Sequence, residues 1–358
     1  MRHFLQKLLV AGMLLTVTLP WAVADETSPL LGPLRLRDLT PFALQRLDFL
    51  PASAAARYPE GWALEANVSY TNTFIMSSNV TEYLETRADR SALGTDDFAA
   101  LRDLEGDAFY FDGSISVLNL SWHYGVSDTI AVYGVLPVHR YHGGSLDTAI
   151  ESFHSKAGFS DFGRDLVARD QFQGYFRIGD SETVLDQAPR GTGFADPVVG
   201  IRHRGLRLGA WDVVLEFAAK LPLGARDPLF SSGHADVGAQ VSLQRQWADH
   251  GLYISISHVA FGGSDDFGDA VNRQIPSATV AWETRIGRNT SAILQATAAR
   301  SVFAGATDPE LAANQYQMSA GVRHVSGALH YTFAITENLV NFNNTPDIGF
   351  HVGVGIAY

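Results

Sequence analysis

The chain has 358 residues, with 38 acidic residues against 26 Lys and Arg, and a formal net charge of −12 at pH 7. This acidic balance argues against a nucleic-acid partner, which would need a basic face. The chain has no cysteine, so it forms no disulfide and carries no lipid on a cysteine. After residue 24, no apolar run reaches the ~18 residues of a membrane-spanning helix. No phosphate-binding glycine loop or dinucleotide motif is present, so no cofactor is expected.

The first 24 residues have the features of a secretory signal peptide. Two basic residues, Arg2 and Lys7, precede an apolar run over residues 8–19, and Ala22-Val23-Ala24 follows. This order predicts export from the cytoplasm and cleavage after Ala24. A membrane anchor is the alternative, but the apolar run is shorter than a spanning helix and ends at a proline.

Residues 25–61 show no alternation of apolar and polar side chains. Four prolines would interrupt any long strand: Pro33, Pro41, Pro51 and Pro59. We interpret the segment as an N-terminal periplasmic arm or as a plug inside the domain that follows. The plug is favoured because five apolar side chains would need cover: Phe42, Leu44, Leu47, Phe49 and Leu50.

From Trp62 onwards, apolar and polar side chains alternate with a period of two, which predicts β-strands. In the first strand, over 62–74, Trp62 and Leu64 share one face, and Glu65 and Asn67 share the other. Eleven further strands are predicted: through 117–124 and 130–138, and at 196–204, 211–221, 236–247, 252–261, 276–285, 290–299, 316–325, 328–337 and 347–358.

The connections between these strands alternate between short and long. The short ones are 205–210, 248–251, 287–289 and 326–327; the long ones are 222–235, 262–275, 300–313 and 338–346. We interpret 75–106 as a surface loop and 141–192 as one external excursion, with a helix over 146–157 and a short strand near 172–178. Short periplasmic turns with long external loops are typical of outer-membrane barrels, whereas a two-sheet sandwich has no reason to sort its loops.

These observations predict an all-β fold, a single closed antiparallel transmembrane β-barrel over residues 62–358. Lipid cannot hydrogen-bond a backbone, so a sheet that crosses a bilayer must close on itself. Counting strands back from a periplasmic C-terminus, with 141–192 as one external excursion, predicts about 12 strands. The count is 14 if residues 170–179 and part of the N-terminal region also cross.

The last twelve residues, Asp347 to Tyr358, alternate strictly and end on an aromatic side chain. Taken alone, this stretch could also be the last strand of a soluble sandwich. Outer-membrane barrels typically end this way, and that likeness implies recognition by the barrel-assembly machinery.

One face of each predicted strand is apolar and is expected to contact outer-membrane lipid. The opposite face would line the lumen. Ionisable residues at these inward positions are Arg202, Glu216, Lys220, Glu283, Arg285, Arg323, His330 and His351. Two interpretations remain open: a charged wall around a pore, or a cross-braced interior that fills the barrel.

Four segments carry a resemblance to a known family: Gly32 to Pro51, Leu146 to His154, Lys220 to Asp236, and Ile335 to Asp347. Through them the chain resembles an uncharacterised family of Gram-negative outer-membrane β-barrel proteins, a domain of unknown function (DUF3187-like). The resemblance extends over nearly the whole chain after the signal peptide. It implies an outer-membrane barrel and no assigned activity. Leu223 departs from the family, which has threonine there.

Enzymes with Ser, His and carboxylate residues at the rim occur among outer-membrane barrels. Two groups here have those residue types: Ser152 and His154 with Asp147 or Glu151, and Ser232, His234 and Asp236. A triad needs Ser near His and His near an acid in space, which sequence neighbours rarely provide. We therefore favour ordinary polar loop residues over a catalytic site, and Ser152, His154 and Glu151 are the weak catalytic candidates.

A metal site from His139, His142 and His154 is a further hypothesis, but scattered histidines are usually ordinary polar residues, and no metal is expected. The function that we expect is passive transport of a small solute across the outer membrane, with apolar solutes among the candidates. A lipid-modifying enzyme of the acyl hydrolase type and a structural or adhesion barrel are the alternatives.

Overall fold

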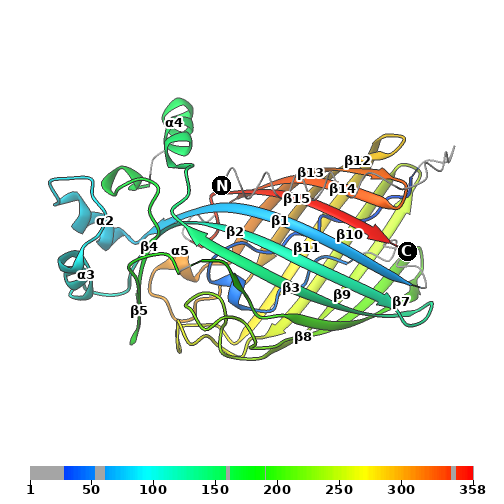
Figure 1. Ribbon diagram of the computed structural model, residues 1–358, viewed down its shortest axis with the longest axis horizontal. Coiled ribbons are helices and arrows are strands. Elements are labelled where there is room, and N and C mark those ends of the chain that lie inside the picture. The colour runs from blue at the N-terminus through cyan, green and yellow to red at the C-terminus, as the bar shows by residue number, and fades with distance from the viewer. Residues whose placement is uncertain (1–27, 53–60, 159–161, 190, 340–343, 358) are drawn as a thin grey trace.

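Twelve antiparallel strands form a closed ring in the computed structural model, which describes residues 28–52, 61–158, 162–189, 191–339 and 344–357 (Figure 1). The predicted signal peptide lies outside the described residues. The ring contains β1 (Trp62–Met76), β2 (Ala108–Gly125), β3 (Ile130–His142), β7 (Val198–Leu208), β8 (Trp211–Lys220), β9 (Asp236–Trp247), β10 (His250–Ala260), β11 (Gln274–Gly287), β12 (Thr290–Ala299), β13 (Gln315–Ser326), β14 (Leu329–Asn338) and β15 (Ile348–Ala357).

The first and last strands pair with each other and close the sheet. The β1–β15 ladder runs from Ala63 opposite Ala357 to Asn72 opposite Ile348. On its other side β1 pairs with β2, and β2 pairs with β3. Every strand of the ring therefore has two neighbours, and the prediction of a closed barrel with 12 strands is confirmed.

Three strands lie outside the ring: β4 (Gln173–Ile178), β5 (Ser181–Leu185) and β6 (Gly193–Phe194). β4 pairs with the part of β2 that extends beyond the barrel, β5 pairs with β4, and β6 pairs with β3. Residues 170–179 thus contain a strand, as the sequence predicted, but this strand does not cross with the ring, and the 14-strand alternative is wrong.

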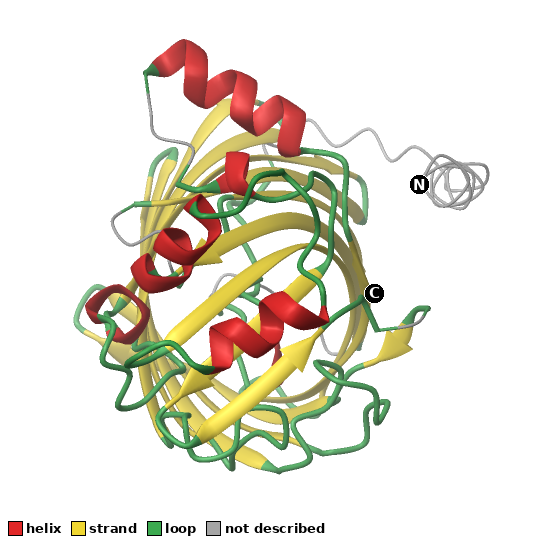
Figure 2. Ribbon diagram, turned by 90° about the vertical axis from the view of Figure 1, so that its left-hand side faces the viewer, coloured by secondary structure: helices red, strands yellow, loops and turns green. Residues whose placement is uncertain are grey.

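The two ends of the barrel differ in their connections. One end, here the short-turn end, has the short turns and the first residue of β1, whereas the long-loop end has the helices (Figures 1 and 2). The helices are α2 (Ser78–Glu85), α3 (Thr95–Arg102), α4 (Asp147–Ala157), α5 (Pro309–Ala312) and the short 3-10 turns η1 (Ala43–Gln45) and η2 (Arg164–Leu166). None of the described helices is long and apolar enough to cross a membrane.

The sequence predicted a loop over residues 75–106, and this prediction is wrong in detail because α2 and α3 lie there. Val80 and Leu84 are one helical turn apart and are fully buried. Together with Leu101 they pack into an apolar cluster with Phe74 and Tyr175. Burial against the extension of β2 thus outweighs the polar and acidic composition of this connection.

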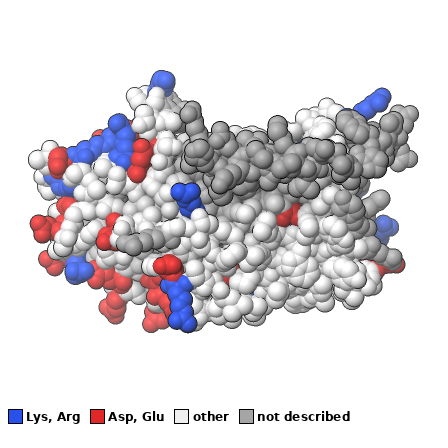
Figure 3. All heavy atoms as spheres, in the orientation of Figure 1, with Lys and Arg blue, Asp and Glu red and all other residues white. Residues whose placement is uncertain are grey.

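The outer face of the ring is apolar. Exposed side chains include Leu64, Leu120, Phe217, Val241, Ile256, Val280, Leu294, Phe333 and Val352. The five described tryptophans lie on strands near the short-turn end: Trp62, Trp122, Trp211, Trp247 and Trp282. Figure 3 shows that charged side chains gather at the long-loop end, on the left, whereas the barrel wall is mostly uncharged. This surface suits a hydrocarbon layer with an aromatic girdle.

A pair of arginine substitutions on β9 tests where the membrane lies. Val241 is near the middle of β9 and Val237 is near its long-loop end, and both side chains face outwards, at 44% and 58% exposure. We expect Val241→Arg to lower the free energy of unfolding in lipid vesicles by about 2–4 kcal/mol, and Val237→Arg by about 0–1 kcal/mol. Denaturant titrations of both variants measure the difference. Equal losses in the free energy of unfolding would contradict a bilayer whose midplane lies near Val241.

Candidate functional site

An N-terminal segment, residues 28–52, runs through the interior of the barrel (dark blue in Figure 1). At the short-turn end, the Ser28 amide donates to the Arg288 carbonyl at 3.1 Å. At the long-loop end, the Ser264 hydroxyl donates to Gln45 Oε1 at 2.6 Å. The segment thus crosses the lumen from one end to the other. It therefore occupies the path that a solute would take.

The turning point of the segment is held by aromatic contacts. Phe42 is 2% exposed, and its ring centroid lies 4.9 Å from the rings of Phe176 and Phe303. Phe267 and Phe111 are 5.4 and 5.9 Å away. The contacts with Phe176, Phe267 and Phe111 are edge-to-face, and that with Phe303 is tilted. Edge-to-face contacts at these distances are favourable beyond simple burial. The aromatic cluster thus docks the N-terminal segment at the long-loop end of the lumen.

The charged residues of the N-terminal segment are largely satisfied within the segment itself. In its tip loop, residues 37–48, the Arg46 guanidinium lies 3.2 Å from Asp38 and 3.3 Å from Asp48. Arg37 donates to the carbonyls of Leu44 and Arg46 at 2.7 and 3.0 Å. The tip loop is therefore braced internally and brings no net formal charge to the wall.

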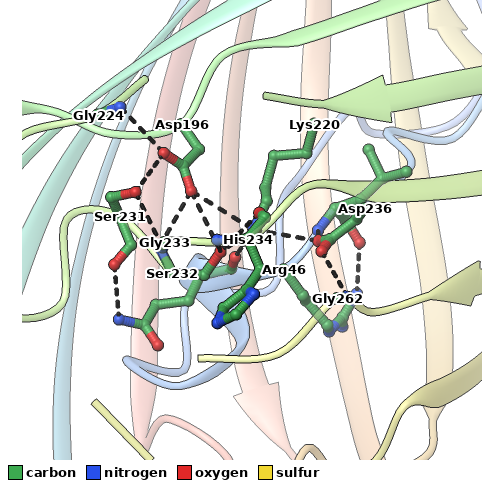
Figure 4. A network of polar contacts seen from close by, with 12 residues as sticks. Arg46, Asp196, Lys220, Gly224, Ser231, Ser232, Gly233, His234, Asp236 and Gly262 are labelled. Atoms are coloured by element: carbon green, nitrogen blue, oxygen red, sulfur yellow. Dashed lines mark hydrogen bonds and ion pairs between the residues drawn. The ribbon is translucent and has the colours of Figure 1, made fainter. Parts of the chain in front are cut away.

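Near the long-loop end, the segment meets an ion cluster on the wall, shown in Figure 4. Lys220 Nζ, which is fully buried, lies 3.2 Å from Asp236 and 3.4 Å from Asp196. Strand register explains the first contact, because Lys220 at the end of β8 stands opposite Asp236 at the start of β9. The segment contributes only backbone: Lys220 donates to the Gln45 carbonyl, and the Leu47 amide donates to Asp236 at 2.6 Å.

Nearer the short-turn end, a second wall ion pair joins Glu283 and Arg323 at 3.5 Å. Again the segment contributes backbone groups. The Gly32 amide donates to Glu283 at 2.8 Å, and Arg323 donates to the carbonyls of Gly32 and Pro33 at 2.7 and 2.9 Å. Tyr253 also donates to Glu283 at 2.8 Å, so this carboxylate keeps wall partners of its own.

Between the ion cluster and the ion pair, the wall of β9 to β14 is polar and uncharged. We call these inward-facing residues the polar band. Its hydroxyl groups pair across neighbouring strands: Ser242 with Ser255 at 2.8 Å, Ser257 with Ser277 at 2.6 Å, Thr279 with Thr297 at 3.2 Å, and Ser319 with Thr336 at 2.7 Å. Four glutamines complete it: Gln240, Gln295, Gln315 and Gln317. The described inward positions between the two charged sites on these strands hold no Asp, Glu, Lys or Arg.

A cavity of about 40 Å³ separates the N-terminal segment from the polar band. It is lined by Arg37, Asp38 and Asp48 on one side and by band residues on the other. A single water needs roughly 10–15 Å³ on this measure, so the cavity has room for a few waters and for no sugar-sized or aromatic solute. In this conformation the space between the segment and the polar band does not admit such a solute.

The inward residues that the sequence singled out fall into three groups. Lys220, Glu283 and Arg323 contact the N-terminal segment, as described above. Arg202 and Glu216 face each other on paired strands and form a buried ion pair at 3.0 Å. The third group contains Arg285, His351 and His330. Arg285 forms an ion pair with Asp249 at 2.9 Å and also donates to the carbonyl of Ser28, at the start of the segment. His351 lies between Ser69 and Thr336, at 2.8 and 2.9 Å, and His330 is partly buried beside Gly355.

Several residues of the site were not singled out from the sequence. Asp196 and the four band glutamines are the main ones. Alternation alone would place these glutamines on the inward face, so that part of the signal was available. Asp196 follows no such pattern, because it lies just before β7, where only the fold brings it to Lys220.

The weak catalytic candidates of α4 are engaged in other contacts or face apart. Glu151 binds Arg169 at 2.9 Å and also contacts Arg90. Burial would raise the pKa of Glu151, but these hydrogen bonds outweigh it and hold the pKa below its ordinary value. A carboxylate held ionised by two arginines suits a structural ion pair. Ser152 and His154 are two positions apart on one helix, and such side chains do not face each other.

The second Ser-His-Asp group is also divided among other partners. Ser232 receives a hydrogen bond from Lys220, and Asp236 belongs to the same ion cluster. His234 Nε2 instead lies 3.0 Å from Asp265.

The proposed metal ligands do not converge on one point. His139 and His142 are three positions apart on β3, an odd spacing that sends side chains to opposite faces. His142 hydrogen-bonds Ser116 at 3.0 Å. Within the described ranges, no group of three or more His, Cys, Asp or Glu residues is arranged to hold a metal ion.

Solved structures share this barrel fold. An outer membrane channel from Pseudomonas putida F1 superposes with a TM-score of 0.51 at 10% identity, covering 84% of this chain and 97% of that one. The toluene transporter TodX of P. putida (TM-score 0.40, 10% identity, covering 90% and 93%) and the NanC porin (0.42, 7%, 82% and 100%) are more distant. At these identities the likeness concerns the fold alone. No curated protein matches the sequence.

The sequence also matches a family model described as "Protein of unknown function (DUF3187)" over residues 11–357, which is nearly its full length. The family resemblance seen in the four sequence segments is thereby confirmed, and the chain belongs to the DUF3187 family of outer-membrane-type β-barrel proteins.

Proposed function

We propose that the protein is a passive outer-membrane channel for a small solute, and that its N-terminal segment is a plug that closes the lumen. One observation carries the proposal: both wall sites that hold the segment bind it through its backbone, while their own charges pair with each other. When a segment held in this way leaves, the charges of these two sites keep their partners on the wall.

The energetics of release follow from these contacts. Removing one member of a buried ion pair is costly, because the remaining charge is left uncompensated. Here Lys220 keeps Asp236 and Asp196, and Glu283 keeps Arg323, when the segment leaves. The lost backbone hydrogen bonds are replaced by water, at a net cost of about 0.5–1.5 kcal/mol each. One exception is Glu65, whose partner Arg35 at 2.9 Å belongs to the segment.

The placement in the cell belongs to the same proposal. The expected signal peptide exports the chain, and the strand from Asp347 to Tyr358 presents it to the barrel-assembly machinery. The short-turn end then faces the periplasm and the long-loop end faces outwards, with the apolar outer face in contact with outer-membrane lipid. The asymmetric loops and the tryptophans near the short-turn end support this orientation.

Substitution of Phe42 tests whether docking of the segment closes the channel. Burial of a Phe side chain contributes about 2–3 kcal/mol, so Phe42→Ala should shift the equilibrium towards the undocked segment by roughly 30- to 150-fold. Single-channel recordings in planar bilayers should show a matching rise in open probability. The matched control is Phe333→Ala, the same change on the lipid-facing side of β14, where the side chain is 51% exposed. Equal behaviour of both variants would contradict a plug.

A reversible cross-link tests the same point from the other direction. The natural chain has no cysteine, so Gln45→Cys with Ser264→Cys introduces the only thiols, at two side chains in direct contact. Joining them with a short cleavable thiol cross-linker should abolish conductance, and cleavage should restore it. Each single-cysteine variant controls for the substitutions. Undiminished conductance in the cross-linked protein would show that the solute path avoids the segment.

A further inference from the structure

The polar band has unsatisfied hydrogen-bonding groups that point to a ligand. Three of the four glutamines that line the cavity are nearly fully buried: Gln240 at 4%, Gln295 at 3% and Gln315 at 3% exposure. Within the described residues, no hydrogen-bond partner lies in reach of Gln240 Nε2, Gln295 Oε1 or Gln315 Oε1. Buried polar atoms without partners are rare and costly, so these groups need an occupant.

The available partners exclude two classes of solute. An apolar solute would leave the amides unsatisfied, at the full desolvation cost of each group. A charged solute would lose its hydration beside a band that has no charged residue, which is more costly still. The nearest wall charges, Glu216 opposite Gln240 and its partner Arg202, already neutralise each other. The band hydroxyls and amides provide both donors and acceptors, and turning an amide over only exchanges the two. A neutral solute that also donates and accepts satisfies such a wall.

We propose that the polar band is a binding site for a neutral, hydroxyl-rich solute of the sugar or polyol class, which enters when the N-terminal segment leaves the lumen. The proposal rests on the channel function proposed above and names its solute class. The cross-strand hydroxyl pairs support it, since pairs such as Ser257 with Ser277 and Ser319 with Thr336 continue the same chemistry around the wall.

Three hexoses of nearly equal size but different charge provide the test: glucose is neutral, glucosamine is cationic and glucuronate is anionic. Uptake of each radiolabelled solute is measured in proteoliposomes with the wild-type protein and with Phe42→Ala. Glucose should enter at least about tenfold faster than either charged solute, because only the charged ones must shed ionic hydration in the band. Equal rates for all three would overturn the assignment of solute class.

Substitutions in the band separate solute binding from water filling. Gln240→Met and Gln295→Met keep side-chain volume but remove the amides, and each should lower the glucose rate about fivefold, the worth of one neutral hydrogen bond. Glucuronate uptake should not fall in parallel. Gln274→Met is the matched control, because Gln274 is exposed and lies outside the cavity. An unchanged glucose rate in both band variants would mean that the amides only hold water.

The outcomes distinguish the two proposals. No uptake of any hexose, together with no ion conductance in Phe42→Ala, would refute the channel itself. Ion conductance together with equal uptake of glucose, glucosamine and glucuronate would support the channel function and refute only the sugar-binding site. Faster migration of unboiled protein on a denaturing gel confirms that each variant is folded before it is assayed.

Discussion

Closure of the sheet is the constraint on which the rest of the molecule depends. A backbone in hydrocarbon has no water to bond with, so β1 must pair with β15 as completely as any two consecutive strands. Closure in turn encloses space. Barrels of about eight strands are filled by their own side chains, whereas those of 16–18 strands leave an open channel. Twelve strands leave more interior than side chains fill, and the N-terminal segment occupies it.

The charged groups inside the barrel lie mainly where the wall binds the N-terminal segment. Two ionic sites of the wall, around Lys220 and around Glu283, bind backbone atoms of the segment. A further buried wall pair, Arg202 with Glu216, is satisfied within itself. The segment neutralises most of its own charge through Arg46, Asp38 and Asp48. On β9 to β14 the wall between these two sites is left with hydroxyls and amides. The polar band also contacts the segment, because Gln317 donates to Asp38 at 3.1 Å and Gln315 donates to Thr40 at 3.5 Å.

Sequence alone predicted the architecture well, because lipid imposes a period of two on every strand and that period is visible in one chain. The helix at 147–157 and all the ring strands but one were predicted to within a few residues; the exception is β2, which begins at Ala108, nine residues before the predicted strand. The inward faces of Lys220 and Glu283 followed from the same parity. Their partners did not, because Gly32 and Gln45 bind through backbone atoms, which leave no trace in residue type. The helices α2 and α3 were missed because Val80, Leu84 and Leu101 are sparse among acidic residues, and only the extension of β2 gives them a surface to pack on.

The composition of the interior also weighs against part of the functional expectation. An apolar solute was among the candidates, and the aromatic cluster around Phe42 is the feature that would receive one. That cluster, however, lies at one end of the path. A permeating molecule must pass the whole lumen, so its rate is limited by the level that it suits least. For an apolar molecule that level is the polar band, where Gln240 and Gln295 would lose water and gain no partner. A neutral hydroxylated molecule finds partners at both charged sites and in the polar band, because hydroxyl groups hydrogen-bond to ionised side chains and to amides alike.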